Sequence, residues 1–479
     1  MESYHKRETH LFSVKGVRFL LEVRTLRVYE IDDLTESILS LPEPLTWTGV
    51  EKSLAGIYDR TELKKAFSAL VEEGVLLNGD EDCIEYRNAC ASQGRDLPLT
   101  SLVLNISQEC NMRCVYCYAD HGLYNTPGKL MDIRTGEASV ELLLRKSGRS
   151  KTCHLTFFGG EPLLNYQLLK HLVVYGKKLA ADYGKKLRFG ITTNGTLLNS
   201  EIISFFKENG FSVVISLDGP PSMHDAQRPL ASGEGSYRVI AAHLDDLLSG
   251  EEINVGCRCT VTPYNLDLES IDAHFTELGF KFYHLEAASF GPFKWREDEL
   301  LEKEMLQEFN RQYGALIEKV WERIKHQEYV EFRNVFAEMR KLDNHELRFF
   351  PCGMGTSMMT VSAEGDIYPC HRLVGLDEYR LGSVFTENIA SNLKNYHPLN
   401  VMAKEGCGRC WARHVCAGDC PAESLLVYGR EKAVERRCVV RKKRLEWAIW
   451  LYSRISKLPE KELREKILSQ EFYFHGLYD

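Results

Sequence analysis

Three cysteines in the first third of the chain have a spacing suited to an iron–sulfur cluster. Cys110, Cys114 and Cys117 lie in the run SQECNMRCVYCYAD, with three residues between the first pair and two between the second. One tight loop of this kind can wrap three thiolates around a cuboidal cluster. A cluster that only carries electrons takes four cysteines, so the triad predicts one iron with a ligand that is not protein. A zinc loop whose fourth ligand lies elsewhere is the alternative.

Seven further cysteines lie in the last third of the chain. They are Cys352, Cys370, Cys407, Cys410, Cys416, Cys420 and Cys438. Isolated CxxC pairs, such as the one formed by Cys407 and Cys410, are typical of structural zinc sites. Iron–sulfur clusters and zinc sites are therefore both open for this group.

Composition limits where the protein works and what it binds. The 15 cysteines are an odd and high number, and the N-terminus MESYHKRETH is too polar for a signal peptide. Such a count predicts metal ligands in a reducing, cytoplasmic compartment. The net charge of -8 provides no basic surface for nucleic acid. No apolar run is long enough to cross a membrane.

The elements that must position these cysteines alternate between strand and helix from about residue 102 to residue 289. Apolar strands are predicted at 102–106, 154–158, 187–193, 212–217, 253–261 and 280–286. Helices are predicted between them at 133–145, 164–182, 201–209, 237–248 and 268–278. This alternation requires right-handed crossovers and a parallel sheet, hence an α/β fold. Ligands bind such sheets at the carboxyl ends of the strands, where the first cysteine loop is expected.

Three further motifs fall at predicted strand ends. Gly159-Gly160-Glu161-Pro162 follows the second strand, 192–195 (TTNG) ends the third, and 216–220 (SLDGP) ends the fourth. The glycines allow backbone to approach a ligand closely, and the carboxylate of Glu161 can pair with an ammonium group. An ordinary Gly-Pro turn is the alternative for the first motif.

Two regions flank the alternating segment. Residues 8 to about 90 are predicted to form a small separate unit, with two or three strands before residue 28, a helix capped by Asp32 or Asp33, a helix around 63–71 and a strand at 75–77. Residues 297 to about 347 are charged and carry apolar residues at helical spacing, which predicts a packed linking helix.

The first cysteine loop, with Tyr116 before its last cysteine, resembles the signature of the radical S-adenosylmethionine (radical SAM) enzymes. The resemblance implies a partial (β/α)6 barrel in which the open iron chelates SAM and reductive cleavage gives a 5′-deoxyadenosyl radical. It implies that Gly159, Gly160 and Glu161 hold the amino group of SAM. It further implies that Ser216 lies near the ribose and carboxylate, with Asn194 as a second candidate.

Arg228, in the run HDAQRP, resembles an arginine that pairs with the SAM carboxylate, for which a guanidinium fork is well suited. A surface arginine is the alternative.

The seven later cysteines resemble the SPASM domain, a C-terminal module of radical SAM enzymes that modify peptides and proteins. The resemblance implies two auxiliary 4Fe-4S clusters besides the SAM-binding cluster. One takes Cys407, Cys410, Cys416 and Cys438. The other takes Cys352, Cys370 and Cys420, and is one ligand short. Residues 353–369 contain no further cysteine, so a substrate thiolate is a suitable occupant of that iron.

The N-terminal unit resembles the winged-helix leader-peptide recognition domain of peptide-modifying enzymes. An extended peptide is expected to add itself to an open sheet edge through main-chain hydrogen bonds. The alternatives for such a unit are DNA binding, which the acidic charge disfavours, and simple packing.

The whole pattern resembles the maturases that install thioether crosslinks in ribosomally made peptides, the sactipeptide and ranthipeptide type. Related enzymes that make formylglycine carry an Asp just after the second cysteine as a proposed base, where this chain has His371. His371 is a candidate for taking the thiol proton, or it packs beside the cluster. Formylglycine formation and carbon–carbon crosslinking remain alternatives. The expected partners are a Cys-rich precursor bound through its leader and an electron donor such as flavodoxin or ferredoxin.

This interpretation divides the chain into five parts. They are residues 1–92 (leader recognition), 93–296 (barrel), 297–346 (linker), 347–445 (SPASM) and 446–479 (C-terminal helix and tail).

Overall fold

The computed structural model describes residues 2–78, 84–91, 97–288, 303–328, 331–386 and 398–469. The predicted domain boundaries at residues 92 and 296, and the tail beyond residue 469, lie outside these ranges. No described helix is both long enough and apolar enough to span a membrane.

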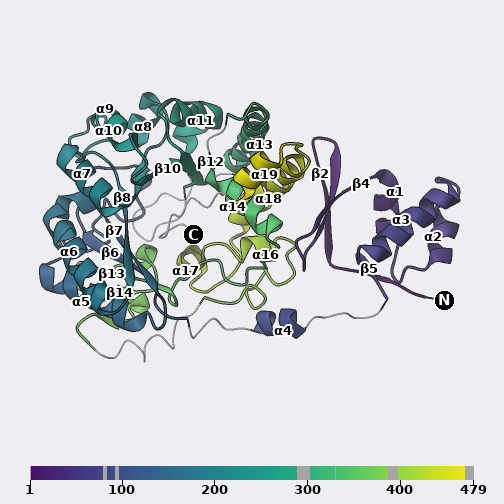
Figure 1. The fold of residues 1–479 in the computed structure, drawn as a ribbon, viewed down its shortest axis with the longest axis horizontal. Helices are drawn as coiled ribbons and strands as arrows, with labels where there is room; N and C mark the ends of the chain where they lie inside the picture. The colour runs from purple at the N-terminus through teal and green to yellow at the C-terminus, as the bar shows by residue number, and fades with distance from the viewer. Residues whose placement is uncertain are drawn as a thin grey trace.

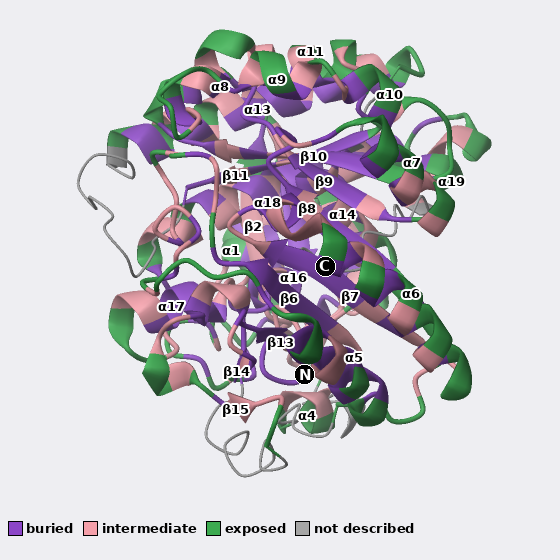
Figure 2. Ribbon diagram, turned by 90° about the vertical axis from the view of Figure 1, so that its left-hand side faces the viewer, coloured by how far each residue is buried: buried purple, intermediate pink, exposed green. Residues whose placement is uncertain are grey.

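A mostly parallel sheet forms the centre of the molecule, as the sequence predicts. Its six main strands are β6 (Ser101–Ser107), β7 (Thr152–Gly159), β8 (Lys186–Thr193), β9 (Ser212–Ser216), β10 (Asn254–Val261) and β11 (Phe282–Ala287). They lie side by side in chain order, and each neighbouring pair is parallel. The strands are buried, as Figure 2 shows for the centre of the sheet. Burial on both faces explains why their sequences are nearly continuous apolar runs.

The predicted crossover helices cover the outside of this sheet (Figure 1). They are α5 (Ile133–Lys146), α6 (Tyr166–Asp182), α7 (Ser200–Asn209) and α11 (Leu268–Glu277). Side-chain caps start three of them: Asp132 accepts from Thr135 N at 2.7 Å, and Asn199 and Asp267 do the same for α7 and α11. The helix predicted at 237–248 is instead two short helices, α9 (Tyr237–Ala241) and α10 (Leu244–Leu248).

The region predicted as one linking helix contains two helices with a strand between them. The helices are α13 (Lys303–Lys325) and α14 (Arg333–Asp343), and the strand is β12 (Glu331–Phe332). β12 pairs in parallel with β11 and becomes the outermost strand on that side of the sheet. A two-residue strand leaves no periodic signal in the sequence, which is why the pattern did not predict it.

The cysteine-rich region is built onto the opposite side of the same sheet. β13 (Met358–Val361) pairs in parallel with β6, and β14 (Asp366–Tyr368) and β15 (Gly382–Ser383) continue the sheet in antiparallel fashion. Beyond β15, the described residues form the helices α16 (Arg413–Cys416), α17 (Pro421–Tyr428), α18 (Glu435–Ser456) and α19 (Lys461–Ser469). α18 packs against α13 and α14. The cysteine-rich region and the barrel therefore share one sheet and one core.

The N-terminal region has a three-stranded antiparallel sheet and three helices. The strands are β2 (Thr9–Val14), β3 (Val17–Glu22) and β4 (Val28–Ile31); the helices are α1 (Asp33–Ser40), α2 (Trp47–Leu54) and α3 (Arg60–Glu72). A short pair, β1 (His5–Lys6) with β5 (Leu76–Leu77), closes the unit. The cap by Asp32 and both predicted helices are present, whereas α2 was not predicted.

The two faces of this N-terminal sheet pack in different directions. Leu20 packs with the helices α1 to α3, whereas Val14, Phe19 and Leu21 belong to the main core. In Figure 1 the sheet accordingly lies between α18 and the three N-terminal helices. A linking helix, α4 (Ile84–Ala91), leads from this unit to the barrel. The prediction of a separate unit therefore needs correction, because one sheet face is part of the central core.

Candidate active site

The first cysteine loop follows β6 at the carboxyl end of the sheet, as predicted. Cys110, Cys114 and Cys117 line a cavity of about 220 Å³. The same cavity is lined by the predicted SAM-side residues Tyr116, Gly159, Gly160, Asn194, Ser216 and Arg228. Residues that are as much as 118 positions apart thus meet at one site, as the parallel-sheet rule requires.

Two glycines allow the cysteine loop to rest on the end of β7. A Cβ at Gly159 would lie 2.2 Å from Ser107 O, and a Cβ at Gly160 would lie 2.2 Å from Glu109 O. Gly159 also has φ of +131°, which disfavours any other residue. The sequence suggested that these glycines make room for a ligand. In the structure they first make room for the backbone that carries Cys110.

The electrostatics of the three thiols fit a metal cluster. Burial raises the pKa of Cys110 to about 12 and the pKa of Cys114 to about 11. Thiols in such surroundings lose their protons readily only when a cation compensates the charge. The amide of Asn194 adds a polar contact, because its Nδ2 lies 3.8 Å from Cys110 Sγ. Three sulfur donors on one cavity wall are a donor set suited to an iron–sulfur cluster.

Glu161 is completely buried and lies behind the cavity rather than on its wall. Its carboxylate accepts from Leu163 N at 2.9 Å, Thr193 Oγ1 at 2.7 Å and Asn194 N at 2.7 Å. Burial raises the pKa of Glu161 to about 6, against the effect of these hydrogen bonds. The observed contacts fix the turn that carries Asn194. The direct contact with SAM stays a prediction.

Tyr116, Asp218 and Arg228 form a buried polar cluster beside the triad. Tyr116 Oη donates to Asp218 Oδ2 at 2.5 Å, and Arg228 Nη1 donates to Tyr116 Oη. Arg228 Nη1 also lies 4.0 Å from Asp218 Oδ2. The carboxylate of Asp218 accepts from Gln227 Nε2 at 3.0 Å and from Thr260 N at 2.9 Å as well.

The surroundings of Arg228 decide between a surface arginine and an arginine of the site. The residue is only 6% exposed, so it is no surface arginine, and its Nε is buried without a hydrogen-bond partner. A buried guanidinium nitrogen without a partner on a cavity wall fits an anionic ligand group such as a carboxylate. Asp218 was not predicted as a site residue, although it lies in the strand-end motif that contains Ser216.

The seven later cysteines line two further cavities in the predicted grouping. Cys352, Cys370 and Cys420 line one of about 530 Å³, and Cys407, Cys410, Cys416 and Cys438 line one of about 40 Å³. Cys416 also faces the larger cavity. Burial raises the pKa of Cys352 and of Cys407 to about 12. Among the described residues, no three His, Cys, Asp or Glu side chains gather around a point that suits a single metal ion.

His371 lies between the first and second cysteine sites. It lines both cavities, its ring packs 4.9 Å from the ring of Phe158 and 6.1 Å from that of Tyr118, and its Nδ1 lies 3.6 Å from Cys370 Sγ. Burial, together with Arg372 and Arg258, lowers the pKa of His371 to about 3. The imidazole is therefore neutral, and its contacts are those of a histidine packed beside a thiol site.

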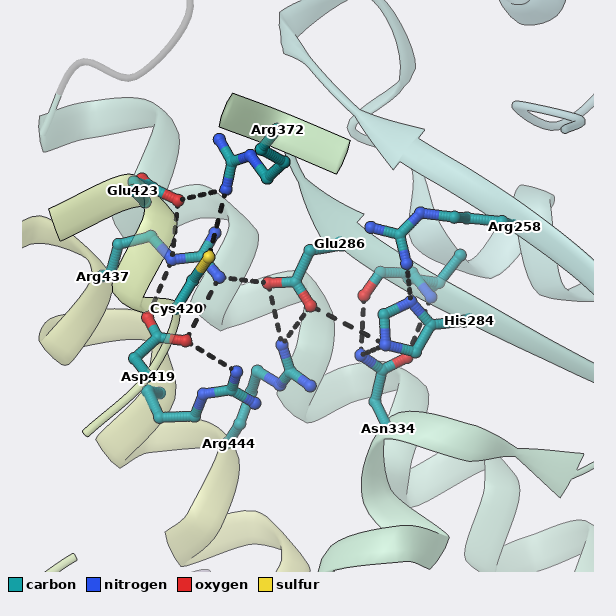
Figure 3. A network of polar contacts seen from close by, with 12 residues as sticks. Arg258, His284, Glu286, Asn334, Arg372, Asp419, Cys420, Glu423, Arg437 and Arg444 are labelled. Atoms are coloured by element: carbon teal, nitrogen blue, oxygen red, sulfur yellow. Dashed lines mark hydrogen bonds and ion pairs between the residues drawn. The ribbon is translucent and has the colours of Figure 1, made fainter. Parts of the chain in front are cut away.

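A network of arginines and carboxylates joins β11 to the cysteine-rich region (Figure 3). Glu286, at the end of β11, pairs with Arg437 at 3.1 Å and Arg444 at 3.2 Å, both on α18. Arg437 also pairs with Asp419 at 2.9 Å. Burial alone would raise the pKa of Glu286, but Arg444 and Arg437 hold it well below its usual value. No local sequence pattern indicates this network, because its members are up to 158 residues apart.

The comparisons with known proteins agree with this site. Residues 104–250 match the Radical SAM superfamily. An uncharacterized protein of Methanocaldococcus jannaschii is 29% identical over 64% of this chain and 93% of its own length. The cysteine-type anaerobic sulfatase-maturating enzyme of Clostridium novyi is 25% identical over 67% of this chain and 87% of its own.

Two solved structures show the same fold. anSMEcpe with bound AdoMet aligns with a TM-score of 0.66 and 22% identity, over 78% of this chain and 98% of that one. Streptococcus suis SuiB bound to the precursor peptide SuiA aligns with a TM-score of 0.51 and 13% identity, over 90% and 99%.

Residues 104–250 form a Radical SAM domain, which makes the chain a radical SAM enzyme. The fold of that superfamily binds S-adenosylmethionine and a 4Fe-4S cluster. Within that superfamily the chain is homologous to the anaerobic sulfatase-maturating enzymes.

Proposed function

We propose that this enzyme installs intramolecular Cys thioether crosslinks in a ribosomally made precursor peptide. The observation that supports this proposal most is the contact between two cysteine-lined cavities. Arg258, Glu286, His371 and Arg372 line both the cavity of Cys110 and the cavity of Cys352. A substrate carbon placed in the first cavity and a substrate sulfur placed in the second would therefore lie next to each other.

In the first cavity, Cys110, Cys114 and Cys117 hold the SAM-binding cluster. When bound, this cluster supplies the electron that splits SAM into methionine and a 5′-deoxyadenosyl radical, which removes a hydrogen atom from the peptide. Arg228 offers its buried guanidinium to the SAM carboxylate, while Tyr116 and Asp218 hold that guanidinium in place. Gly159, Gly160, Asn194 and Ser216 provide the rest of the cavity wall.

In the second cavity, Cys352, Cys370 and Cys420 would hold an auxiliary cluster, which would supply an iron to which the substrate thiolate could bind. Arg372 donates to Cys420 Sγ at 3.4 Å and to Glu423 at 3.3 Å, which fixes one ligand. His371 packs beside Cys370, and its candidacy as the proton acceptor stays a prediction. Cys407, Cys410, Cys416 and Cys438, which line the smallest of the three cysteine-lined cavities, would hold the third cluster.

Peptide docking is assigned to the N-terminal sheet. β2 and β4 each pair only with β3 among the described strands, so each has an edge to which an extended peptide can add. One face of this sheet packs on the main core. A leader peptide bound at the edge of β2 or β4 would therefore be held at a fixed distance from the barrel. This arrangement raises the effective concentration of the core peptide. In this proposal residues 1–92 recognise the leader, residues 93–296 form the barrel and residues 347–445 form the SPASM region.

Formylglycine formation is the second candidate, because the named relatives include sulfatase-maturating enzymes. The two chemistries differ in sulfur balance. A thioether forms with loss of two hydrogens and keeps the sulfur, whereas conversion of Cys to formylglycine removes the sulfur. His371, at the position where formylglycine-forming relatives are expected to carry Asp, favours the thioether.

The experiment is co-expression with the precursor, sought as a short Cys-rich reading frame beside the gene, followed by mass spectrometry. Thioether formation predicts a loss of two hydrogens per link and cysteines that no longer alkylate. The matched control is the C110A/C114A/C117A variant, which should return unmodified peptide. Loss of sulfur would support formylglycine formation. Zinc in place of iron, or no deoxyadenosine under anaerobic reduction, would reject the enzymatic proposal altogether.

A further inference from the structure

The cavity lined by Cys352, Cys370 and Cys420 carries a strong excess of positive charge. Eight lysine or arginine side chains line it, against three carboxylates. Those three carboxylates, Glu286, Glu338 and Asp419, are all engaged by arginines of α18 at 2.9 to 3.3 Å. Neighbouring Glu423 and a cluster held by three thiolates offset only part of the remaining charge. An excess of cations on the wall of a cavity favours an anionic occupant.

Arg258 is the cation placed where the proposed chemistry must occur. It lies on β10, its backbone neighbours are Ser216 on β9 and His284 on β11, and it lines both cavities. Arg228 lies on the wall of the first cavity only, beside Tyr116. Three arginines therefore line the first cavity. Arg228 is held by the Tyr116–Asp218 pair, whereas Arg258 and Arg372 both also line the second cavity. Arg372 is engaged with Cys420 and Glu423, so Arg258 is the one directed to the barrel side.

The guanidinium of Arg258 is held in a defined direction. Its Nη1 donates to His284 Nδ1 at 3.0 Å, which places the imidazole proton on Nε2. Asn334 packs beside that nitrogen, with its Nδ2 3.1 Å from Nε2, but does not accept a hydrogen bond from it. Asn334 is itself fixed by two hydrogen bonds of 2.8 Å with the backbone of Leu285. Figure 3 shows this chain of contacts on the opposite side of Glu286 from Arg437. With Nη1 directed to His284, the guanidinium has a fixed orientation at the junction of the two cavities, which suits recognition of an anion there.

We propose that Arg258 binds a side-chain carboxylate of the substrate peptide, so that the residue joined to the Cys sulfur is Asp or Glu. This inference rests on the proposed function, because only a substrate carbon beside SAM needs recognition at the junction of the two cavities. The thiolate of the substrate belongs at the cysteine end of the larger cavity. Arg258 lies on the barrel side, where the acceptor carbon must present its hydrogen.

The test uses the full-length, cluster-reconstituted enzyme with two peptides. They are the precursor encoded beside the gene and a copy whose acceptor Asp or Glu is changed to the amide. Affinity is measured by fluorescence anisotropy, crosslinking by mass spectrometry, and SAM binding and deoxyadenosine formation are measured without peptide. Wild-type enzyme should bind the acidic peptide at least ~30-fold more tightly than the amide, the effect of losing one partner of a buried charged pair.

The variants test whether discrimination between the two peptides depends on the position of Arg258 or on positive charge anywhere in the larger cavity. Arg258→Gln should bind both peptides within a few-fold of each other, and Arg258→Lys should fall between Gln and wild type. Arg333→Gln, a change in the larger cavity only, should keep the discrimination. In Arg258→Gln the loss of peptide discrimination should exceed any change in SAM affinity, with unchanged iron content showing that it folds.

Three results would overturn the inference. They are unchanged discrimination in Arg258→Gln, a SAM affinity that falls as much as the peptide affinity, and crosslinks mapped to residues that have no carboxylate. Failure of the proposed function has a different signature, because peptide would return without the loss of two hydrogens. The affinity ratio of the acidic and amide peptides would still report on Arg258 in that case.

Discussion

Replacement of Asp218 by Asn is the most informative single change in the first cavity. The amide has almost the same shape as the carboxylate, so the change removes charge and reverses one hydrogen-bonding group. Asp218 accepts hydrogen bonds from Tyr116 Oη, Gln227 Nε2 and Thr260 N. All three partners donate through these contacts, and the new NH₂ group of Asn must face at least one donor.

The expected cost follows from the buried charges. Hydrogen bonds to a charged acceptor contribute ~1.5–3 kcal/mol each, and breaking one side of a buried ion pair costs about 3–5 kcal/mol. Because these contributions overlap at one carboxylate, we expect Asp218→Asn to lower the free energy of unfolding by about 4 kcal/mol. For a chain of this length, such a loss of unfolding free energy corresponds to a fall in Tm of roughly 4–10 °C.

Tyr116→Phe provides the comparison. Arg228 and Asp218 are already 4.0 Å apart, so without the phenol they can pair directly, and we expect a loss of only ~1 kcal/mol. Thermal unfolding followed by circular dichroism under anaerobic conditions measures both variants. The reasoning is refuted if Asp218→Asn melts within 1 °C of wild type, a margin well below the roughly 4 °C expected, or if Tyr116→Phe is the more damaging change.

Three further predictions concern other parts of the chain. Gly160→Ala should abolish cluster loading at the triad, measured as loss of about four irons per chain, because its Cβ would meet Glu109 O at 2.2 Å. Glu8→Gln should speed deuterium exchange in β2, because Glu8 holds the Arg413 guanidinium with both carboxylate oxygens. His224→Gln should flatten the pH dependence of stability. Burial lowers the pKa of His224 to about 2, so below the unfolded value of about 6.5 its contribution falls by up to ~1.4 kcal/mol per pH unit as pH decreases.

Each of these changes has a control elsewhere in the chain. Gly56 has open space where a Cβ would be added, so Gly56→Ala should keep its iron. Lys15 makes a surface ion pair with Glu318, so Lys15→Gln should leave the exchange of β2 nearly unchanged. His171→Gln, a change at a partly exposed histidine, is compared with His224→Gln in the same pH series. If a variant and its control give the same iron content, deuterium exchange or pH dependence of stability, the physical reason given for that variant is wrong.

The sequence predicted the six barrel strands because buried parallel strands are continuous apolar runs. The strands around Val103 and Val214 show this, being buried and flanked by helices with clear caps. The grouping of the later cysteines came from the resemblance to the SPASM domain and not from local spacing, since Cys352 and Cys420 lie 68 residues apart. The short strands β12 and β13 were not predicted, since two to four residues carry no usable period.

The supporting contacts of the site were beyond the reach of sequence reasoning. Glu286 and Arg437 lie 151 residues apart, and no local pattern links them. The role of Gly160 was assigned to ligand approach, because the sequence shows that space is needed but not what fills it. Asp218 was overlooked for a similar reason, since a carboxylate that orients Tyr116 and Arg228 has no spacing rule of its own.

The central claim is that the cluster of Cys110, Cys114 and Cys117 leaves one iron for SAM. Electron–nuclear double resonance on the reduced enzyme, with SAM labelled by ¹⁵N at its amino group, tests it most directly. We predict a nitrogen coupling that appears when labelled SAM is added and is missing in the C110A/C114A/C117A variant. A cluster signal that SAM does not change, or a coupling that persists in that variant, would contradict the account.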